Sequence, residues 1–159
     1  MAIRIAIMPL HELVELVNEW GTLPREFDGR SGAPAGHELT RLADELHPIF
    51  AADDGRAARV TALLRQTEVR PILADDLSQA WLVDDPRQAT RAAAALALRE
   101  QLAEHPGRIG VCADRQCADV YVDLSPAGRR RFCCLTCQNR ARAEAFRKRR
   151  ALPMSGPSE

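Results

Sequence analysis

Five cysteines lie between Cys112 and Cys137, whereas the rest of the 159-residue chain contains none. They form two groups, Cys112-x4-Cys117 and Cys133-Cys134-x2-Cys137, and fifteen residues separate the groups. Four thiolates can hold a metal ion in a tetrahedron, and a short gap lets one turn of the backbone present two sulfurs to the same point. The spacing predicts a structural metal site, and Zn²⁺ is the ion that we expect there.

Other interpretations of the cysteines stay open. An iron–sulfur cluster also takes four thiolates, although this spacing is not one of the usual cluster runs. Disulfides would need an oxidising compartment, and Met1 to Met8 show no secretion signal, so a cytoplasmic location is expected. The thiols could also be simply buried or reactive. Within the second group, either Cys133 or Cys134 can pair with Cys137, and Phe132 is expected to pack beside the site.

The net charge of zero hides an uneven distribution. Residues 1–107 carry 11 basic and 17 acidic residues, whereas residues 108–150 carry 11 basic and four acidic residues. The segment with the cysteines is therefore strongly cationic, which suggests that it meets a polyanion. No apolar run is long enough to span a bilayer, so no membrane partner is expected.

Mainly helical elements must position this site. Apolar spacing predicts helices over 10–20, 37–50 and 56–66, and an alanine-rich helix from about Pro86 to Glu104. Residues 21–36 are rich in Gly, Pro and Ser and predict a long loop. Two apolar stretches within 69–83 predict a short β-hairpin.

The cysteine segment shows its own pattern. Alternation over 119–124 predicts a strand, 125–128 a turn, 129–132 a return strand, and Cys133 the start of a final helix. The layout resembles a treble clef. We therefore expect an α+β, mainly helical fold: a helical N-terminal domain with a small β-hairpin over 1–107, a treble-clef-like zinc finger over 108–150, and a disordered tail over 151–159.

The cations suggest nucleic-acid binding, because the planar guanidinium fork of arginine suits phosphate oxygens and guanine edges. Candidates for contacting DNA are Arg129, Arg130 and Arg131 before the second cysteine group, and Arg140, Arg142, Arg147, Lys148, Arg149 and Arg150 on the final helix. The alternative is a solvated helix whose late cations complement the helix dipole.

A family resemblance rests on these same residues. The run Cys112…Cys117…Arg130-Arg131-Phe132-Cys133…Cys137-Gln138-Asn139-Arg140 resembles the CGNR zinc-finger family, with Gln138 in place of the signature glycine. The resemblance implies that Cys112, Cys117, Cys133 and Cys137 are the metal ligands, and it adds Asn139 to the DNA-binding candidates. Cys134 is then a small residue in the first turn of the helix or, alternatively, a redox-reactive thiol beside the metal.

The upstream part resembles the ABATE domain that precedes such fingers, through Leu16-Val17-Asn18 in the first helix. The resemblance implies a bacterial stress-responsive transcription regulator, in which a sensor or assembly domain precedes a DNA-binding finger. Expected partners are double-stranded DNA, a small-molecule effector and a second copy of the chain. The alternative function is a zinc-structured adaptor that binds an acidic protein.

Enzyme chemistry is not expected. The four histidines do not pair at metal-ligand spacing, and no phosphate loop or nucleophile motif is present. The paired aspartates fall at turns and helix starts, where carboxylates cap backbone amides. Asn18, Trp20 and Arg25 border the long loop and are candidates for binding a small ligand, with core packing or loop closure as the alternative.

Overall fold

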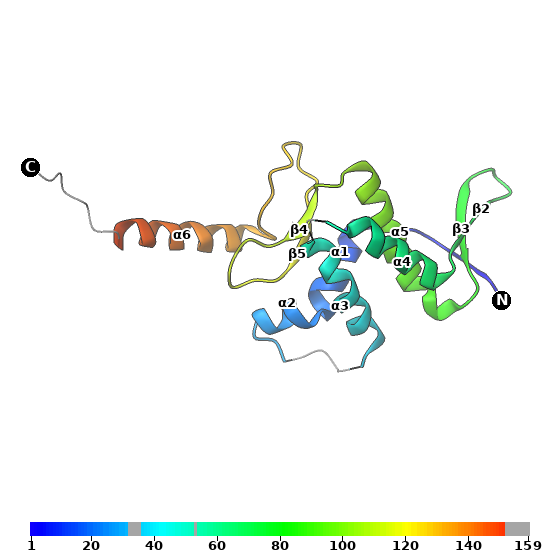
Figure 1. Cartoon of the computed structure of the whole chain (residues 1–159), viewed down its shortest axis with the longest axis horizontal. Coiled ribbons are helices and arrows are strands. Elements are labelled where there is room, and N and C mark those ends of the chain that lie inside the picture. The colour runs from blue at the N-terminus through cyan, green and yellow to red at the C-terminus, as the bar shows by residue number, and fades with distance from the viewer. Residues whose placement is uncertain (32–35, 53, 152–159) are drawn as a thin grey trace, which may run out of the picture.

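The computed structural model describes residues 1–31, 36–52 and 54–151. The fold is α+β and about 54% helical, so the predicted mainly helical class is confirmed. Figure 1 shows a central body, a small sheet at one end of the molecule and a long helix, α6 (Leu135–Ala151), that extends from the other end. The metal-site candidates lie where α6 leaves the body.

Four helices build the body: α1 (Leu10–Trp20), α3 (Glu38–Ala51), α4 (Arg56–Thr67) and α5 (Ala89–Glu104). Each matches a predicted helix to within a few residues; a 3₁₀ turn (Pro86–Gln88) precedes α5. Leu13 and Val17 of α1 are fully buried, as their spacing predicts. Alanines on several faces of α5 are also buried, so α5 can pack closely against neighbours on more than one side.

The small sheet has three antiparallel strands, in the order β1 (Ile3–Ile5), β3 (Gln79–Val83) and β2 (Arg70–Leu73). The predicted hairpin is present as β2 and β3. The third strand, β1, was not predicted, because three residues are too few to show an alternating pattern. Ile5 and Val83 are buried against Ala92 and Leu96 of α5, which attaches the sheet to the body.

The predicted long loop over 21–36 is partly wrong, because it contains a short helix, α2 (Thr22–Phe27). The Asp44 carboxylate of α3 accepts hydrogen bonds from the Thr22 backbone N–H and from its hydroxyl, both at 2.7 Å. A residue 22 positions away therefore stabilises the start of α2, and no local pattern could show this. Residues 32–35 of the predicted loop lie outside the described residues.

A second sheet pairs β4 (Ile109–Val111) with β5 (Val120–Val122), on either side of the first cysteine pair. Ile109, Val120 and Val122 are buried in the same cluster as Leu13 and Val17 of α1. The core is therefore continuous across residue 107, where the sequence predicts a domain boundary. We call residues 1–107 the body and residues 108–150 the cysteine module, and the division into domains stays a prediction.

Two polar contacts reinforce this junction. The Asn18 amide of α1 donates to the Val120 carbonyl oxygen at 3.1 Å and accepts from the Val120 N–H at 2.8 Å. Nε2 of His47, a buried residue of α3, lies 2.8 Å from the Ala118 carbonyl oxygen. Since a buried backbone group without a partner is costly, these side chains replace the strand that β5 lacks on this side.

The predicted return strand over 129–132 is wrong, because β5 pairs with β4 and not with this segment. Side chains hold the segment instead: the Tyr121 hydroxyl donates to the Arg130 carbonyl oxygen at 2.8 Å, and the Asp123 carboxylate accepts from the Arg130 N–H at 2.9 Å. Gly110 permits this arrangement, since a Cβ there would lie 2.7 Å from the Tyr121 hydroxyl.

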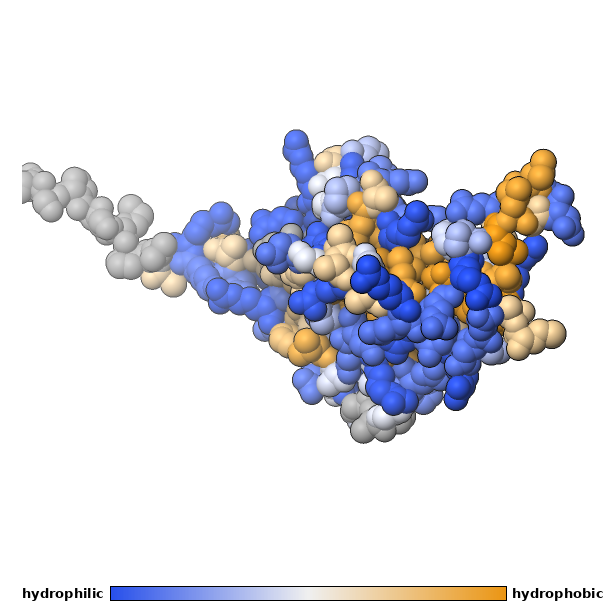
Figure 2. Space-filling view, turned by 45° about the vertical axis from the view of Figure 1, so that its right-hand side comes forward, coloured by the Kyte–Doolittle hydropathy of each residue, from blue (hydrophilic) through white to orange (hydrophobic). Residues whose placement is uncertain are grey.

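The final helix begins two residues later than predicted, at Leu135 instead of Cys133. It reaches Ala151, so the rest of the predicted disordered tail lies outside the described residues. Figure 2 shows a mostly hydrophilic surface over α6 and an apolar area at the hairpin end, where Leu73 and Leu77 are exposed. Among the described residues, no helix combines the length and the apolar character needed to cross a bilayer.

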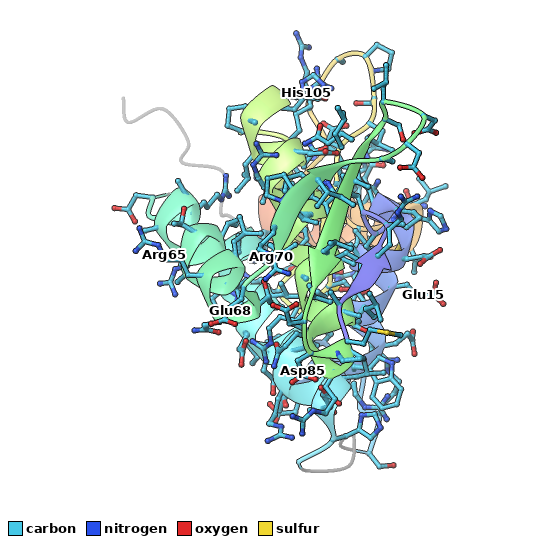
Figure 3. All side chains as sticks on the ribbon, turned by 90° about the vertical axis from the view of Figure 1, so that its right-hand side faces the viewer. Glu15, Arg65, Glu68, Arg70, Asp85 and His105 are labelled. Carbon is cyan, nitrogen blue, oxygen red and sulfur yellow. The ribbon has the colours of Figure 1, made fainter. Side chains whose placement is uncertain are left out.

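The Asn18 contact gives a first prediction. Replacing Asn18 with Ala leaves the N–H and carbonyl of the buried Val120 unpaired, so we expect the free energy of unfolding to fall by about 2 kcal/mol. Glu15→Ala is the matched control, because Glu15 lies on the same helix and points to solvent (Figure 3). Urea unfolding of the two variants measures the difference, and equal stabilities would contradict a structural role for the amide.

Candidate metal centre

Four thiols converge at the base of α6. The Sγ atoms of Cys112, Cys117, Cys133 and Cys137 all lie within 4.8 Å of one another. The Cys117–Cys133 and Cys133–Cys137 sulfur pairs are 3.7 and 3.5 Å apart. Four sulfurs bound tetrahedrally to one zinc ion at about 2.3 Å would lie about 3.8 Å from one another. The cluster therefore has the dimensions of a four-thiolate metal site.

The burial of these thiols also favours a site that binds a cation. Cys112, Cys117 and Cys137 are buried, and Phe132 packs against them as predicted. Burial raises the pKa of Cys117 to about 12 and also raises the pKa of Cys133 and Cys137. These thiols stay protonated near neutral pH unless a positive charge compensates the thiolates, and a divalent metal ion supplies that charge when it binds.

The first cysteine pair sits in a tight turn between β4 and β5. The Cys117 N–H donates to the Asp114 carbonyl oxygen at 3.0 Å, and the Asp119 N–H points at the Cys117 sulfur at 3.5 Å. The Cys112 N–H donates to the Asp119 carbonyl oxygen at 2.8 Å, which closes the turn. Because the β4–β5 sheet lies on the body core, both sulfurs are held at a fixed place relative to the body.

Arg140 connects this turn to α6. Its Nε donates to the Asp114 carboxylate at 2.5 Å, and its terminal nitrogen lies 3.3 Å from the Cys137 sulfur. Asp114 is buried, and its other oxygen accepts from the Gln116 N–H at 3.1 Å. Burial alone would raise the pKa of Asp114, but the bonds from Gln116 and Arg140 hold it below the usual value. Arg140 therefore orients a ligand and fixes the start of α6.

Arg130 has a similar role on the other side of the cluster. Its guanidinium donates to the carbonyl oxygens of Val122, Phe132 and Cys133, and it lies over the Tyr121 ring at 5.4 Å. These bonds fold the segment before the second cysteine group onto β5. The segment also reaches the first turn, since the Ala113 N–H donates to the Arg131 carbonyl oxygen at 2.8 Å.

Of the ten residues predicted to contact DNA, Arg130 and Arg140 thus have guanidinium groups that bond within the module. Lys148 pairs with Glu144 at 2.6 Å, one turn earlier on α6. The other candidates have exposed side chains; they are Arg129 and Arg131 before the second cysteine group, and Asn139, Arg142, Arg147, Arg149 and Arg150 on α6. The structure therefore separates the cations whose charged groups bond within the module from the cations whose charged groups form no ion pair among the described residues.

Among the cavities lined by described residues, none contains all three of the predicted ligand-binding residues. Asn18 binds Val120, as described above. Trp20 stacks on His37 with the ring centres 4.5 Å apart, and Arg25 donates to the Glu19 and Ser31 carbonyl oxygens. Asn18 alone borders a groove of about 330 Å³ between α1 and the cysteine module, and the ligand-binding role stays a prediction.

Sequence reasoning missed Asp114 and Tyr121. The signal for Asp114 is present, because it is an acidic residue between two ligand candidates in an otherwise basic segment. A buried acid in that position needs a cationic partner. No signal singles out Tyr121, since its role depends on the pairing of β4 with β5 and on Gly110.

Comparison with known families agrees with this geometry. Residues 108–150 match the model of the CGNR zinc finger family. The match covers the cysteine module and supports the predicted zinc-finger resemblance there; the resemblance of the upstream part to an ABATE domain stays a prediction. A search of curated proteins returned no match.

A second prediction concerns Arg140. In Arg140→Ala the Cys137 thiolate loses a hydrogen bond and the buried Asp114 loses its cation, so we expect metal affinity to fall about 10- to 100-fold. Competition with a chromogenic chelator measures this affinity. Arg142→Ala is the control, because Arg142 is an exposed arginine two residues after Arg140 on the same helix. A similar loss in both variants would mean that only net charge matters.

The thiol pKa values give a third prediction. Because the pKa values of Cys117, Cys133 and Cys137 are raised, each of these groups carries a proton in the metal-free protein between pH 6 and 8. Metal binding must displace these protons, so affinity rises with pH by at least about three log units per pH unit. Chelator competition across pH 6–8 measures the slope. A slope near zero would show that the thiolates already exist without metal.

Proposed function

We propose that the cysteine module is a zinc-structured, treble-clef-like DNA-binding module, and that the chain is a transcription regulator. Zinc is the proposed ion because four thiolates in a closed tetrahedral set are typical of structural zinc sites. The role proposed for the ion is structural: it ties the β4–β5 turn to the first turn of α6. We propose a binding role for the chain and no catalytic one.

The observation that carries the DNA-binding proposal is the exposed cation array on and beside α6. Six arginines in this array form no ion pair within the described residues; they are Arg129, Arg131, Arg142, Arg147, Arg149 and Arg150. α6 extends away from the body, so most of its circumference is accessible (Figure 1). A helix of this kind can lie along a duplex with arginines on the phosphates and Asn139 toward a groove.

The segment before the second cysteine group widens this surface. Arg129, Arg130 and Arg131 line a hollow of about 340 Å³ beside the first turn of α6, and Gln138 borders it. Arg130 is held by backbone carbonyls, so its exposed neighbours Arg129 and Arg131 are the residues proposed to meet phosphate. The arginines before the second cysteine group and the arginines of α6 can then contact the DNA phosphate backbone at two separate points.

The proposal gives the body a sensing or assembly role. The groove between α1 and the cysteine module is the place where a small effector would touch both parts at once, since Leu10, Val14, Tyr121 and Leu124 all border it. A mainly apolar lining with a few polar groups is typical of small-molecule sites. A second copy of the chain is the other proposed partner of the body.

A salt titration tests the DNA-binding proposal. Zinc-loaded protein with six phosphate contacts should bind duplex DNA with a log–log salt slope of about −5. Arg147→Ala/Arg149→Ala removes two contacts, so the slope should become shallower, about −3.5, and affinity should drop for all sequences alike. Fluorescence anisotropy of a labelled duplex measures both quantities.

The control removes the same charge from the body. Arg59→Ala/Arg65→Ala changes two exposed arginines of α4, and Arg65 points away from the molecule in Figure 3. DNA affinity of this variant should equal that of the parent. Equal losses in both double variants, or no binding at low salt, would overturn the proposal and favour the adaptor, whose binding to an acidic protein shows a shallower slope.

A further inference from the structure

The cysteine cluster contains one sulfur more than a tetrahedral metal site uses. Cys134 is exposed, whereas three of the four converging cysteines are buried. Its sulfur lies 3.7 Å from the Cys133 sulfur, so a solvent-accessible thiol is in contact with one of the four candidate metal ligands. Neither the metal geometry nor the exposed cation array accounts for a cysteine at this position.

We propose that Cys134 and Cys137 form a peroxide-sensitive dithiol, and that its oxidation to a disulfide removes a ligand from the metal and frees the base of α6. The inference rests on the proposed binding of zinc by the cysteine module. It adds a modification site to that module and a chemical class of signal, a hydroperoxide, that acts on it.

The backbone selects Cys137 as the partner of Cys134. Disulfides usually join Cα atoms that are about 4.4–6.8 Å apart. Neighbouring residues such as Cys133 and Cys134 have Cα atoms only about 3.8 Å apart, which is too close for an unstrained bridge. Residues three apart in the first turn of a helix lie about 5 Å from each other, within the disulfide range.

Cys134 does occupy this helical position. It directly precedes α6, and its carbonyl oxygen accepts a hydrogen bond from the Gln138 N–H at 3.2 Å, as in a regular helical turn. Cys134-Leu135-Thr136-Cys137 therefore spans the first turn of α6. The two residues between the cysteines are exposed, so oxidants can approach from the solvent side.

The reaction has two balanced steps. The Cys134 thiol loses its proton, and the thiolate attacks one oxygen of a hydroperoxide and breaks the O–O bond. Cys134 becomes a sulfenic acid, and the departing oxygen takes up the proton, so hydrogen peroxide releases water. The Cys137 thiolate then attacks the sulfenic sulfur and displaces hydroxide, which forms the Cys134–Cys137 disulfide. Two electrons pass from the two sulfurs to the peroxide, and a dithiol reductant reverses the change.

The consequence follows from the contacts of Cys137. As a disulfide sulfur it no longer provides a thiolate, and the Arg140 guanidinium loses the negative charge that it contacts at 3.3 Å. Only three thiolates are then left to hold the metal, and the contact between Arg140 and Cys137 is weakened. α6 carries most of the arginines of the exposed cation array. Oxidation would therefore detach the proposed DNA-binding helix from the cysteine cluster that orients it.

The test follows zinc release and disulfide formation together. Zinc-loaded full-length protein is treated with hydrogen peroxide, a chromogenic chelator records free zinc, and peptide mass spectrometry maps disulfides. We expect release with a Cys134–Cys137 bridge, and return of zinc binding after dithiothreitol. Cys134→Ser should bind zinc normally when reduced and should release it at least tenfold more slowly under peroxide.

Thr136→Ala is the matched control, because it changes an exposed residue between the two cysteines without removing a thiol. It should behave like the parent protein. Equal release rates from Cys134→Ser and the parent, a bridge that excludes Cys134, or zinc retained after Cys134 is oxidised would each overturn the inference while leaving the metal site intact. Reduced parent protein without stoichiometric zinc would instead overturn the proposed function itself.

Discussion

The convergence of four thiols from two segments is the constraint on which the rest of the cysteine module depends. Burial raises the pKa of Cys117, Cys133 and Cys137, so these groups can become thiolates together only when a cation compensates the charge. The surrounding residues serve this convergence. Arg140 lies between Asp114 and Cys137, and Arg130 holds the carbonyls that lead into the second cysteine group. Two guanidinium groups therefore lie beside the cysteine cluster, and the charge of one of them is paired with the Asp114 carboxylate.

The second constraint is the shared core between the module and the body. A cysteine module of this size buries little apolar surface alone, yet Ile109, Val120 and Val122 lie in the same cluster as Leu13 and Val17. The part of the module around β4 and β5 is therefore held by apolar packing and by the Asn18 and His47 contacts. Residues 125–137 are held instead by side-chain bonds to the backbone. The segment that leads into α6 therefore has less apolar packing than β4 and β5.

Much of this arrangement could be predicted from the sequence, and the failures have one common cause. Apolar periodicity predicts the four body helices, because each buries one stripe of side chains. Cysteine spacing predicts a metal cluster, and the four sulfurs that the family resemblance implies as ligands do converge. The structure departs from prediction at α2, at β1 and at the segment 129–132. In each case the partner that decides the outcome is not the nearest segment in the sequence: Asp44 for α2, β3 for β1, and β4, which pairs with β5 in place of residues 129–132.

The same limit applies to the arginines, which look equivalent in the sequence. Arg130 and Arg131 are exposed neighbours, yet the Arg130 guanidinium donates to three backbone carbonyls and the Arg131 guanidinium forms no hydrogen bond with a described residue. Arg140 and Arg142 differ in the same way on α6. An arginine that satisfies carbonyls or a buried carboxylate cannot also meet a phosphate without breaking those bonds. Charge counting alone therefore overstates the surface available to a polyanion, and the position of each guanidinium relative to the cysteine cluster decides whether it shapes the module or faces a partner.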